Sequence, residues 1–502
     1  MRNFELIIII IILLTLIGFI ISINKKFLWL RFLPGLAIVF TILHFIIEEY
    51  HWQMFPVYIF TIFLFIISLR NLFLVTNVQN YFLSRKRKIL KIIGIVFVFI
   101  IFFISILPLI LLPIFTLPAP NGHHIIGTKF FEFIDVNRPD IHTEDPDDFR
   151  SISLQIWYPA ENNKRSKPIP YMHKAAAECW AKAWKIKPEF LLTHFSLVQT
   201  HSYLNAKTAV EKGPFPVILF SPSGNMSYNT SLFEELVSHG YVIVSIGHPH
   251  WCSYYFYESG QINCTGINDP YYDKLWEEEN LDIVHETKEA LTVAKNLEEK
   301  KDLQLKLNSV MPLEVEDIVL WTEDYDFVIQ EIENINSNDS LFNGLFDLDR
   351  LGVIGLSNGG AAAGQFCTLD NRAKAGVNLG GFMFGDIVDK NIRPPFLFMD
   401  HIEPWCEECM PINDHIYSKV ENSAYQVQIK GAKHFNFTDL SLAGPFLKMI
   451  GLTGSINGYR FIKIQNDYVL AFLNKHLKGL DDPILKDSSK DYPEVKYKSR
   501  HP

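Results

Sequence analysis

The sequence predicts an α/β domain with a mostly parallel sheet, preceded by a region of four transmembrane helices. Three observations predict this arrangement: four long apolar stretches at the start, alternating strand and helix patterns after them, and a change of net charge between the two regions. Residues 1–118 carry ten basic and three acidic side chains, a net charge of +7, whereas the rest of the 502-residue chain carries −16. The overall charge of −9 argues against a nucleic-acid partner, which requires a basic face.

Four apolar stretches in the first region have the composition of membrane spans. They cover residues 6–23, 27–47, 55–75 and 92–115, each close to the roughly 20 residues that cross a hydrocarbon core. Basic side chains gather in the loops after the first and third stretches, and such loops stay in the cytoplasm. We therefore expect a multi-pass protein anchored in the lipid bilayer of the cell membrane, with its second domain on the extracytoplasmic side. His44, near the end of the second stretch, is expected at the membrane interface.

The second domain, residues 119–502, begins at a chain-breaking PAPNG run. Residues 151–159 alternate apolar and polar side chains, which is typical of an antiparallel strand. Continuous apolar runs predict buried parallel strands at residues 216–220, 242–246, 351–356, 375–379 and 396–399. Amphipathic segments at residues 230–239 and 323–335 predict helices between the strands. Residues 269–317 are rich in Glu, Lys and Leu and predict a helical insertion over the site.

A candidate nucleophile lies where the strand at residues 351–356 leads into the sequence GLSNG, residues 355–359. Glycine on each side of Ser357 relieves crowding in a sharp strand-to-helix turn, which exposes the hydroxyl group. A serine hydroxyl is inert until a base takes its proton, and in this topology the base follows the last parallel strand. His434 comes soon after the strand predicted at residues 425–429, so the pattern predicts Ser357 as a nucleophile and His434 as its base.

A carboxylate that orients the base is expected at the carboxyl end of a strand between the nucleophile and the base. Asp400 ends the apolar run at residues 395–399 and occupies the usual place for this acid. Asp386, which follows residues 384–385, is the alternative. The sequence therefore predicts a Ser–His–Asp triad with Asp400 as its acid.

Two backbone N–H groups are needed to stabilise the negative oxygen that forms when a carbonyl group is attacked. One donor is expected at Asn358, which directly follows the nucleophile. The other is expected in the loop 221–225, with the sequence SPSGN, after the strand at residues 216–220. We choose Gly224 as this second donor, with Asn225 next to it, because backbone donors leave almost no signature in the side chains.

Several motifs, in order along residues 117–478, resemble the platelet-activating-factor acetylhydrolase family of α/β-hydrolases, especially its bacterial, lipase-like members. They are PAPNG (118–122), QIWYPA (155–160), FSP (220–222), SHGY (238–241), DLDRLGVIG (347–355) and HFNFTD (434–439). The resemblance implies the α/β-hydrolase fold and a Ser–His–Asp esterase acting on short-chain or phospholipid-like esters in lipid degradation. It also implies that no metal or other cofactor takes part. With its four-helix region, the chain resembles a membrane-anchored member.

Two departures from the family pattern bear on activity. Many members carry the acid directly after the strand that matches residues 375–379, where this chain has Gly380. Asn358 stands where an aromatic residue is common. Gly380 leaves open a catalytically impaired binding or sensing module, and the same residues also suit an acyltransferase.

Cysteine and histidine pairs elsewhere in the chain do not support a metal site. Cys406 and Cys409 lack the two further ligands that a zinc site requires, so a short disulfide or free thiols are expected. Cys252 and Cys264 are another possible disulfide pair on an external domain. The sequence HPH at residues 248–250 is expected to line the mouth of the site.

Overall fold

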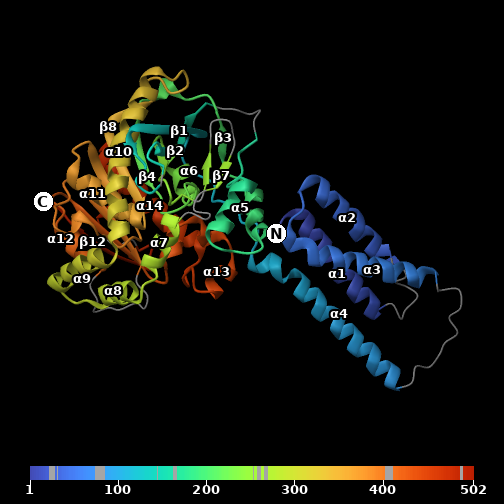
Figure 1. Cartoon of the computed structure of the whole chain (residues 1–502). Helices are drawn as coiled ribbons and strands as arrows, with labels where there is room; N and C mark the ends of the chain where they lie inside the picture. Colours follow the sequence, from blue (N-terminus) through green and yellow to red (C-terminus); the bar gives the residue numbers. More distant parts are fainter. Residues whose placement is uncertain are drawn as a thin grey trace. The chain divides into compact units, whose positions relative to one another are not determined.

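The structure of the chain is a computed structural model, which divides into two compact units (Figure 1). One comprises Met1–Phe115 with Ala443–Phe446, and the other comprises Thr116–Leu442 with Leu447–Pro502. The residues described are 1–21, 29–30, 32–73, 85–143, 145–161, 167–252, 254–256, 262–264, 270–401, 411–486 and 490–502.

The first unit holds the apolar helices. They are α1 (Asn3–Ile21), α2 (Leu33–Ile47), η2 (Trp52–Met54), α3 (Phe55–Phe73) and α4 (Arg85–Leu111). Within the described residues, two helical segments, Trp52–Arg70 and Ile92–Leu111, are long and apolar enough to cross a membrane. The apolar helices Asn3–Gly18 and Leu33–Ile47 are shorter. The described residues of the four predicted stretches are thus largely helical, but a region of four membrane spans is not confirmed.

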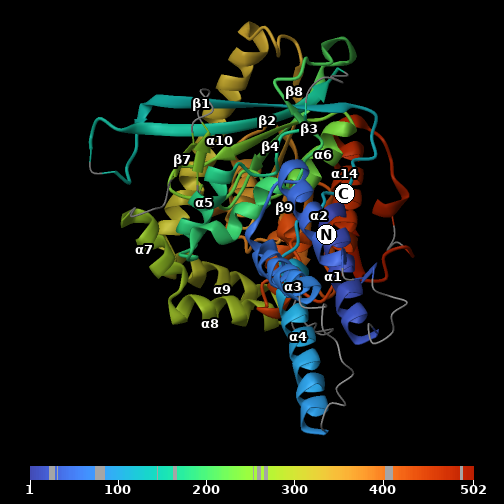
Figure 2. The ribbon, with the colours of Figure 1, turned by 90° about the vertical axis from the view of Figure 1, so that its right-hand side faces the viewer.

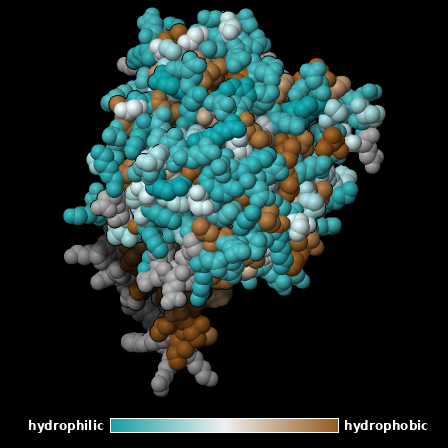
Figure 3. Space-filling model, turned by 90° about the vertical axis from the view of Figure 1, so that its left-hand side faces the viewer, coloured by the Kyte–Doolittle hydropathy of each residue, from teal (hydrophilic) through white to brown (hydrophobic). Residues whose placement is uncertain are grey.

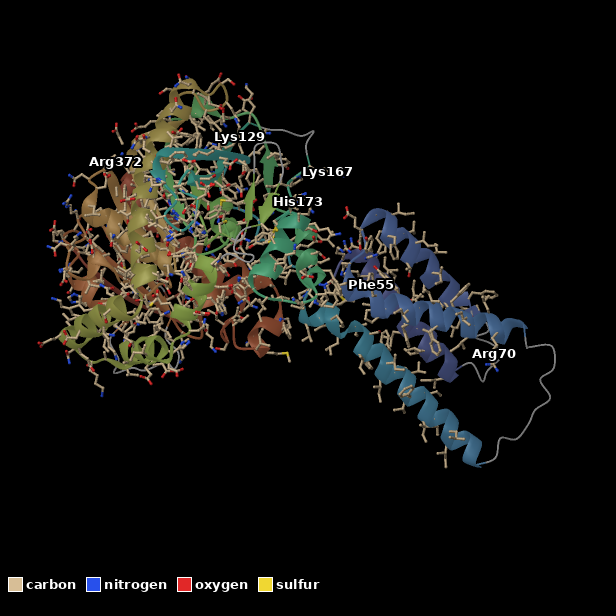
Figure 4. All side chains as sticks on the ribbon, in the orientation of Figure 1. Phe55, Arg70, Lys129, Lys167, His173 and Arg372 are labelled. Atoms are coloured by element: carbon tan, nitrogen blue, oxygen red, sulfur yellow. A yellow bond between two sulfur atoms is a disulfide. The ribbon has the colours of Figure 1, made fainter. Side chains whose placement is uncertain are left out.

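Apolar side chains cover the outside of the helical unit. On α4, Ile93, Phe97, Ile100 and Ile104 are each at least half exposed. The coloured atoms at the lower edge of Figure 3, where this unit is visible, are largely brown, whereas the visible face of the larger unit is mostly hydrophilic. Figure 4 shows the charged Arg70 toward the end of α3, far along the helix from Phe55 at its start. An apolar surface of this extent is unusual for a helix in water.

A cluster of polar side chains is buried inside the helical unit. Glu5 accepts a hydrogen bond from Arg2 Nε at 2.7 Å, and its Oε1 lies 2.9 Å from His51 Nε2. His44 is fully buried, with its Nδ1 3.0 Å from the Tyr58 hydroxyl. Polar groups taken out of water need such partners. His44 is therefore a buried member of a hydrogen-bond network near the end of α2, and its expected position at the membrane interface stays a prediction.

The larger unit is built on a ten-stranded sheet in the order β12-β11-β10-β9-β8-β4-β5-β2-β1-β3. Its strands are β1 (Ile125–Pro139), β2 (Phe149–Ala160), β3 (Ser202–Leu204), β4 (Phe215–Ser221), β5 (Val242–Gly247), β8 (Phe346–Leu356), β9 (Ala373–Leu379), β10 (Phe396–His401), β11 (Ala424–Ile429) and β12 (Val495–Arg500). The strands from β5 through β4, β8, β9 and β10 to β11 run parallel to their neighbours. β2 pairs antiparallel with β5 and with β1, and β12 pairs antiparallel with β11. The continuous apolar runs are thus the parallel strands, as predicted.

Helices cover both faces of this sheet (Figures 1 and 2). Successive residues of a strand point to opposite faces of the sheet, so the neighbours of Gly352 and of Val353 in β8 show which helices cover each face. Gly352 faces Leu473 of α14 (Gly458–Lys478), which packs against α6 (Thr230–Ser238). Val353 belongs to the core that contains Trp321 of α10 (Pro312–Asn338), and α10 packs against α11 (Asn358–Leu369). Each helix pair therefore lies on its own face, as an α/β fold with a buried parallel sheet requires.

The insertion predicted at residues 269–317 is helical in its described part. It comprises α7 (Pro270–Glu279), α8 (Asp282–Val293), α9 (Leu297–Val310) and the start of α10, and α7, α8 and α9 lie together in Figure 2. Shorter elements are α5 (Lys174–Ala183), η4 (Glu189–Leu197), η5 (Val210–Lys212), η6 (Asp386–Val388), α12 (Asp414–Ser418), η7 (His434–Phe437), η8 (Asp439–Leu442), α13 (Pro445–Met449) and η9 (Pro483–Leu485).

A disulfide joins Cys179 of α5 to Cys264 of β7, which pairs with β6 (Tyr254–Phe256) in a small hairpin. β7 comprises Ile262–Cys264. The predicted pair of Cys252 with Cys264 is therefore wrong, because Cys264 is bonded to Cys179. Cys406 and Cys409 lie outside the described residues.

Candidate active site

Ser357 occupies a sharp turn between β8 and α11. Its backbone has φ +55° and ψ −124°, a conformation that a residue with a side chain rarely adopts. A Cβ atom at Gly355 would lie 1.8 Å from the carbonyl oxygen of Gly359, and one at Gly359 would lie 1.9 Å from that of Ser221. Both glycines are thus required by the close approach of backbone segments around the turn. Strain of this kind persists where the surrounding structure over-determines it, often at functional sites.

Ser357 and His434 line one cavity of about 350 Å³. The same cavity is lined by Ser223 and Gly224, from the loop after β4. Asn358 is the first residue of α11, where helix geometry leaves the N–H without an intrahelical acceptor. The structure therefore brings together the predicted nucleophile, the predicted base and one of the two predicted N–H donors, and places the second donor next to the nucleophile.

The tautomer of His434 follows from its partner. Nδ1 lies 3.1 Å from the carbonyl oxygen of Gly380, which can only accept a hydrogen bond, so Nδ1 carries the proton. Nε2 is then unprotonated and can accept a proton from a hydroxyl group. Burial lowers the pKa of His434, and the bond to Gly380 opposes this shift in part. The imidazole is accordingly neutral at neutral pH, the form that a general base needs.

Asp400 does not lie against the base as the sequence predicted. Its buried carboxylate accepts hydrogen bonds from Asn413 Nδ2 at 3.0 Å and Gln426 Nε2 at 3.2 Å. The next residue, His401, points to the other side of β10, and its ring centre lies 5.7 Å from that of His434. Because side chains alternate along a strand, a shift of one residue moves Asp400 away from the base. Burial also raises the pKa of Asp400 to about 7.

Asp386, the alternative acid, is also placed elsewhere. It begins η6, is largely exposed, and pairs with Lys390 Nζ at 2.9 Å. Gly380 occupies the position at which the family resemblance implies the acid. Its φ is +65°, and a Cβ atom there would lie 2.4 Å from the ring of Phe437. The group that lies at Nδ1 of the predicted base is therefore a backbone carbonyl, which has no signature in the side-chain pattern.

Asp400 is nevertheless linked to the loop that holds this carbonyl. Asn413 Nδ2 donates to Asp400 and also to the carbonyl oxygen of Gly381, at 2.9 Å. Asn413 Oδ1 accepts from the Met383 N–H at 3.0 Å. Gly380 itself donates its N–H to the carbonyl oxygen of Met399 at 2.8 Å. Asn413, which the sequence analysis missed, thus fixes the segment after β9 in place.

A second buried acid lies next to Asn358, the residue after the predicted nucleophile. Asn358 Nδ2 donates to Glu314 Oε2 at 2.6 Å, and Glu314 belongs to the first turn of α10. Burial raises the pKa of Glu314 to about 8, and the nearby Glu279 adds to this shift. Glu314 is therefore mostly uncharged near neutral pH. The insertion thus contributes a side chain that holds the residue after Ser357.

Comparison with known proteins decides the family. The family model described as "Platelet-activating factor acetylhydrolase, isoform II" matches residues 112–491, three quarters of the chain. The chain belongs to this family. A platelet-activating factor acetylhydrolase of Bos taurus is 24% identical over 382 residues, which are 72% of this chain and 77% of that protein. A protein of Arthroderma benhamiae, named "Probable 1-alkyl-2-acetylglycerophosphocholine esterase", is 22% identical, over 76% of this chain and 93% of its own length.

A solved structure supports the fold. The ferulic acid esterase from Streptomyces cinnamoneus superimposes with a TM-score of 0.58 at 21% identity, over 76% of this chain and 98% of that chain. The larger unit thus has the α/β-hydrolase fold. Membership of the platelet-activating factor acetylhydrolase family makes the chain a carboxylic-ester hydrolase.

Proposed function

We propose that the chain hydrolyses esters with Ser357 as the nucleophile and His434 as the general base. The observation that carries this proposal is that a strained serine and a histidine with an available Nε2 line one cavity. The Ser357 oxygen bonds to the acyl carbon while its proton passes to His434 Nε2, and the N–H groups of Asn358 and Gly224 stabilise the negative oxygen. His434 then protonates the departing alcohol. Water, deprotonated by His434, then attacks the acyl-enzyme, and His434 returns the proton to the Ser357 oxygen as the carboxylic acid leaves.

In this mechanism the Gly380 carbonyl replaces the carboxylate of a triad. Its hydrogen bond keeps the proton on Nδ1 of His434, so the reactive tautomer is preserved. Loss of that tautomer is the reason why an Asp→Asn exchange in a triad lowers kcat by about 10⁴-fold. A carbonyl carries no full charge, so it stabilises the imidazolium intermediate less than a carboxylate does. Asp400 acts through Asn413 on the segment 381–383, which follows Gly380, and is a positioning residue.

The cavity walls support esters with a phospholipid-like headgroup as substrates. Trp184, Trp251, Tyr272 and Trp276 line the cavity together with the carboxylate of Glu279. Aromatic faces attract a quaternary ammonium group, and a carboxylate adds to that attraction. The names of the matching relatives agree with such a substrate. We therefore propose short-chain or phospholipid-like carboxylic esters.

We further propose that the helical unit anchors the enzyme in the cell membrane, with the larger unit on the extracytoplasmic side. The exposed apolar side chains of α4 and the two long apolar helices support the anchor. The disulfide between Cys179 and Cys264 supports an oxidising location. Protease added outside sealed vesicles of oriented membranes should digest residues 116–502, and full protection of that region would contradict the proposed side.

Covalent labelling tests the central proposal. A fluorophosphonate probe should label the folded full-length chain at Ser357, and the variants Ser357→Ala and His434→Ala should lose labelling and esterase activity. Absence of labelling in the folded wild-type chain would favour a binding or sensing module instead. Product analysis with added alcohols then separates hydrolysis, which yields free acid, from acyl transfer, which yields a new ester.

A further inference from the structure

A second Ser–His–Asp arrangement lies buried in the larger unit, apart from His434. Ser221, the last residue of β4, has its Oγ 2.7 Å from Nε2 of His248, which follows β5. His248 Nδ1 lies 2.7 Å from Oδ2 of Asp324, on α10. All three residues are at most 1% exposed. None of them belongs to the motif that pointed to Ser357.

Two arginines fix the direction of every hydrogen bond in this arrangement. Arg150 donates from Nε to Asp324 Oδ1 at 2.7 Å and from Nη2 to Oδ2 at 2.8 Å, and Arg138 Nη2 donates to Oδ1 at 2.9 Å. Burial pushes the pKa of Asp324 upward, but the Arg150 charge and the bonds from His248 and Arg150 hold it well below its usual range. The ionised carboxylate only accepts, so His248 carries its proton on Nδ1. Nε2 therefore accepts, and the Ser221 hydroxyl donates.

Burial excludes a second active site at Ser221. Its hydroxyl is fully enclosed, and the cavity at Ser357 is lined by Ser223 and Gly224 but not by Ser221. Ser221 is instead the residue from which the loop with the proposed N–H donor Gly224 begins. Its carbonyl oxygen lies against Gly359 of α11, where even a Cβ atom would come within 1.9 Å. Ser221 thus begins the loop that carries Gly224 and also lies against the residue that follows Asn358.

The histidine is held by packing as well as by hydrogen bonds. The ring of His248 is stacked on Trp321 of α10, with ring centres 4.3 Å apart and an angle of 2° between the planes. Trp321 in turn packs edge-on against Trp251, which lines the cavity. Burial lowers the pKa of His248, so the ring stays neutral and Nε2 remains an acceptor.

We propose that Ser221, His248 and Asp324 are positioning residues that hold the oxyanion loop 222–224 in the geometry required by the transition state. This inference rests on the proposed reaction at Ser357. The hydrogen bond from Ser221 to His248 fixes the first residue of the loop, and the Arg150–Asp324 pair anchors His248 to β2 and α10. Because an oxyanion donor acts mainly in the transition state, its displacement lowers kcat more than it raises KM.

The loss of kcat cannot exceed the loss expected when the Gly224 N–H donor itself is removed. Removal of one oxyanion donor lowers kcat by roughly 10²–10³-fold, and a misplacement of about 1 Å costs on the order of 10²-fold. We expect Ser221→Ala to lower kcat by about 10–100-fold with KM changed less than about threefold, since this variant loses the tether but keeps the Gly224 N–H.

Two exchanges at His248 separate the halves of the arrangement. The amide of His248→Asn can reach the place of Nδ1 and keep the bond to Asp324, whereas that of His248→Gln can reach the place of Nε2 and accept from Ser221. We expect His248→Gln to retain more kcat than His248→Asn, whatever the loss of stability. Tyr241→Phe is the matched control, because it removes a hydrogen bond of 2.9 Å to Asn474 from a buried tyrosine that does not line the cavity.

The experiment measures kcat and KM on a soluble short-chain ester, the rate of fluorophosphonate labelling of Ser357, and Tm, all on the full-length chain. Support consists of a loss of kcat and labelling rate in Ser221→Ala and His248→Asn, partial rescue in His248→Gln, and unchanged kcat in Tyr241→Phe despite a lower Tm. The proposal is overturned if Ser221→Ala, a deletion of one oxygen, keeps wild-type kcat, or if His248→Gln is no better than His248→Asn. A wild-type chain that is not labelled at Ser357 would overturn the proposed reaction itself, and this inference with it.

Discussion

Replacement of Asp400 by Asn discriminates between a carboxylate triad and a base oriented by a carbonyl. The carboxylate accepts one hydrogen bond from Asn413 and one from Gln426, at 3.0 and 3.2 Å. An Asn side chain keeps one acceptor oxygen but turns an NH₂ group toward one of the two donors. One buried bond is therefore lost, at a cost of about 1–3 kcal/mol in the free energy of unfolding.

The expected loss of activity in Asp400→Asn is small because His434 keeps its bond to Gly380. We expect kcat to fall less than about tenfold. A triad acid would instead cost about 10⁴-fold, or about 5.5 kcal/mol of transition-state stabilisation. The assay is steady-state hydrolysis of p-nitrophenyl acetate, with His434→Ala as the inactive reference and the exposed Asp386→Asn as the neutral one. A fall of 10³-fold or more in kcat of Asp400→Asn, measured well below the Tm of the variant so that it is folded, would refute the carbonyl-oriented base.

Asp400→Asn should also differ from the wild-type chain in how its stability depends on pH. The pKa of Asp400 is raised from 3.8 to about 7 in the folded chain because the carboxyl is buried. A raised pKa means that the folded state holds its proton more tightly, so this group contributes stability at low pH that is lost as the pH rises through about 7. Compared with Asp400→Asn, the wild-type chain should lose more Tm between pH 5 and pH 8, to be measured by thermal unfolding at about five pH values.

Three further exchanges test other parts of the site. Gly380→Ala should lower both Tm and kcat, because its φ is +65° and a Cβ atom would meet a ring at 2.4 Å, whereas Gly479→Ala, with φ +68° and open space, should lower Tm alone and by less. We expect the wild-type kcat to fall above about pH 8, because ionisation of the Glu314 carboxyl places a negative charge against Asn358, and Glu314→Gln should abolish this fall; a pH profile identical to wild type would exclude that role. Glu279→Gln should raise KM severalfold for esters with a quaternary ammonium group and leave KM for neutral esters unchanged, and equal effects on both would contradict a cation subsite.

The parts of the fold that could be predicted are those whose side chains carry a periodic signal. The buried parallel strands are continuous apolar runs, and each appears in the structure within a few residues of its predicted bounds. β12 (Val495–Arg500) was missed because it is an edge strand that alternates with lysines, which resembles an exposed loop in sequence. β1 was missed as well, although it pairs with the predicted antiparallel strand β2 over most of its length.

In the site, Ser357 and His434 could be predicted because the order of the strands places a turn after β8 and a loop after β11. The orienting group could not, because a backbone carbonyl at Gly380 leaves no side-chain pattern. Asp400 was chosen because it ends a strand, but the sequence does not fix which face the last residues of a strand point to. Asp400 and His401 point to opposite faces of the sheet, and it is the ring of His401 that lies beside His434.

The disulfide has a consequence for how the enzyme is produced and used. It crosslinks Cys179 of α5 to a small hairpin, and α5 is followed directly by Trp184, which lines the cavity and packs edge-on against Phe435. Reduction of this disulfide would remove a crosslink next to the cavity wall, at a distance from Ser357 and His434. We expect enzyme folded in a reducing cytosol to keep its hydrolytic step and to hydrolyse a broader set of esters than enzyme folded in an oxidising compartment.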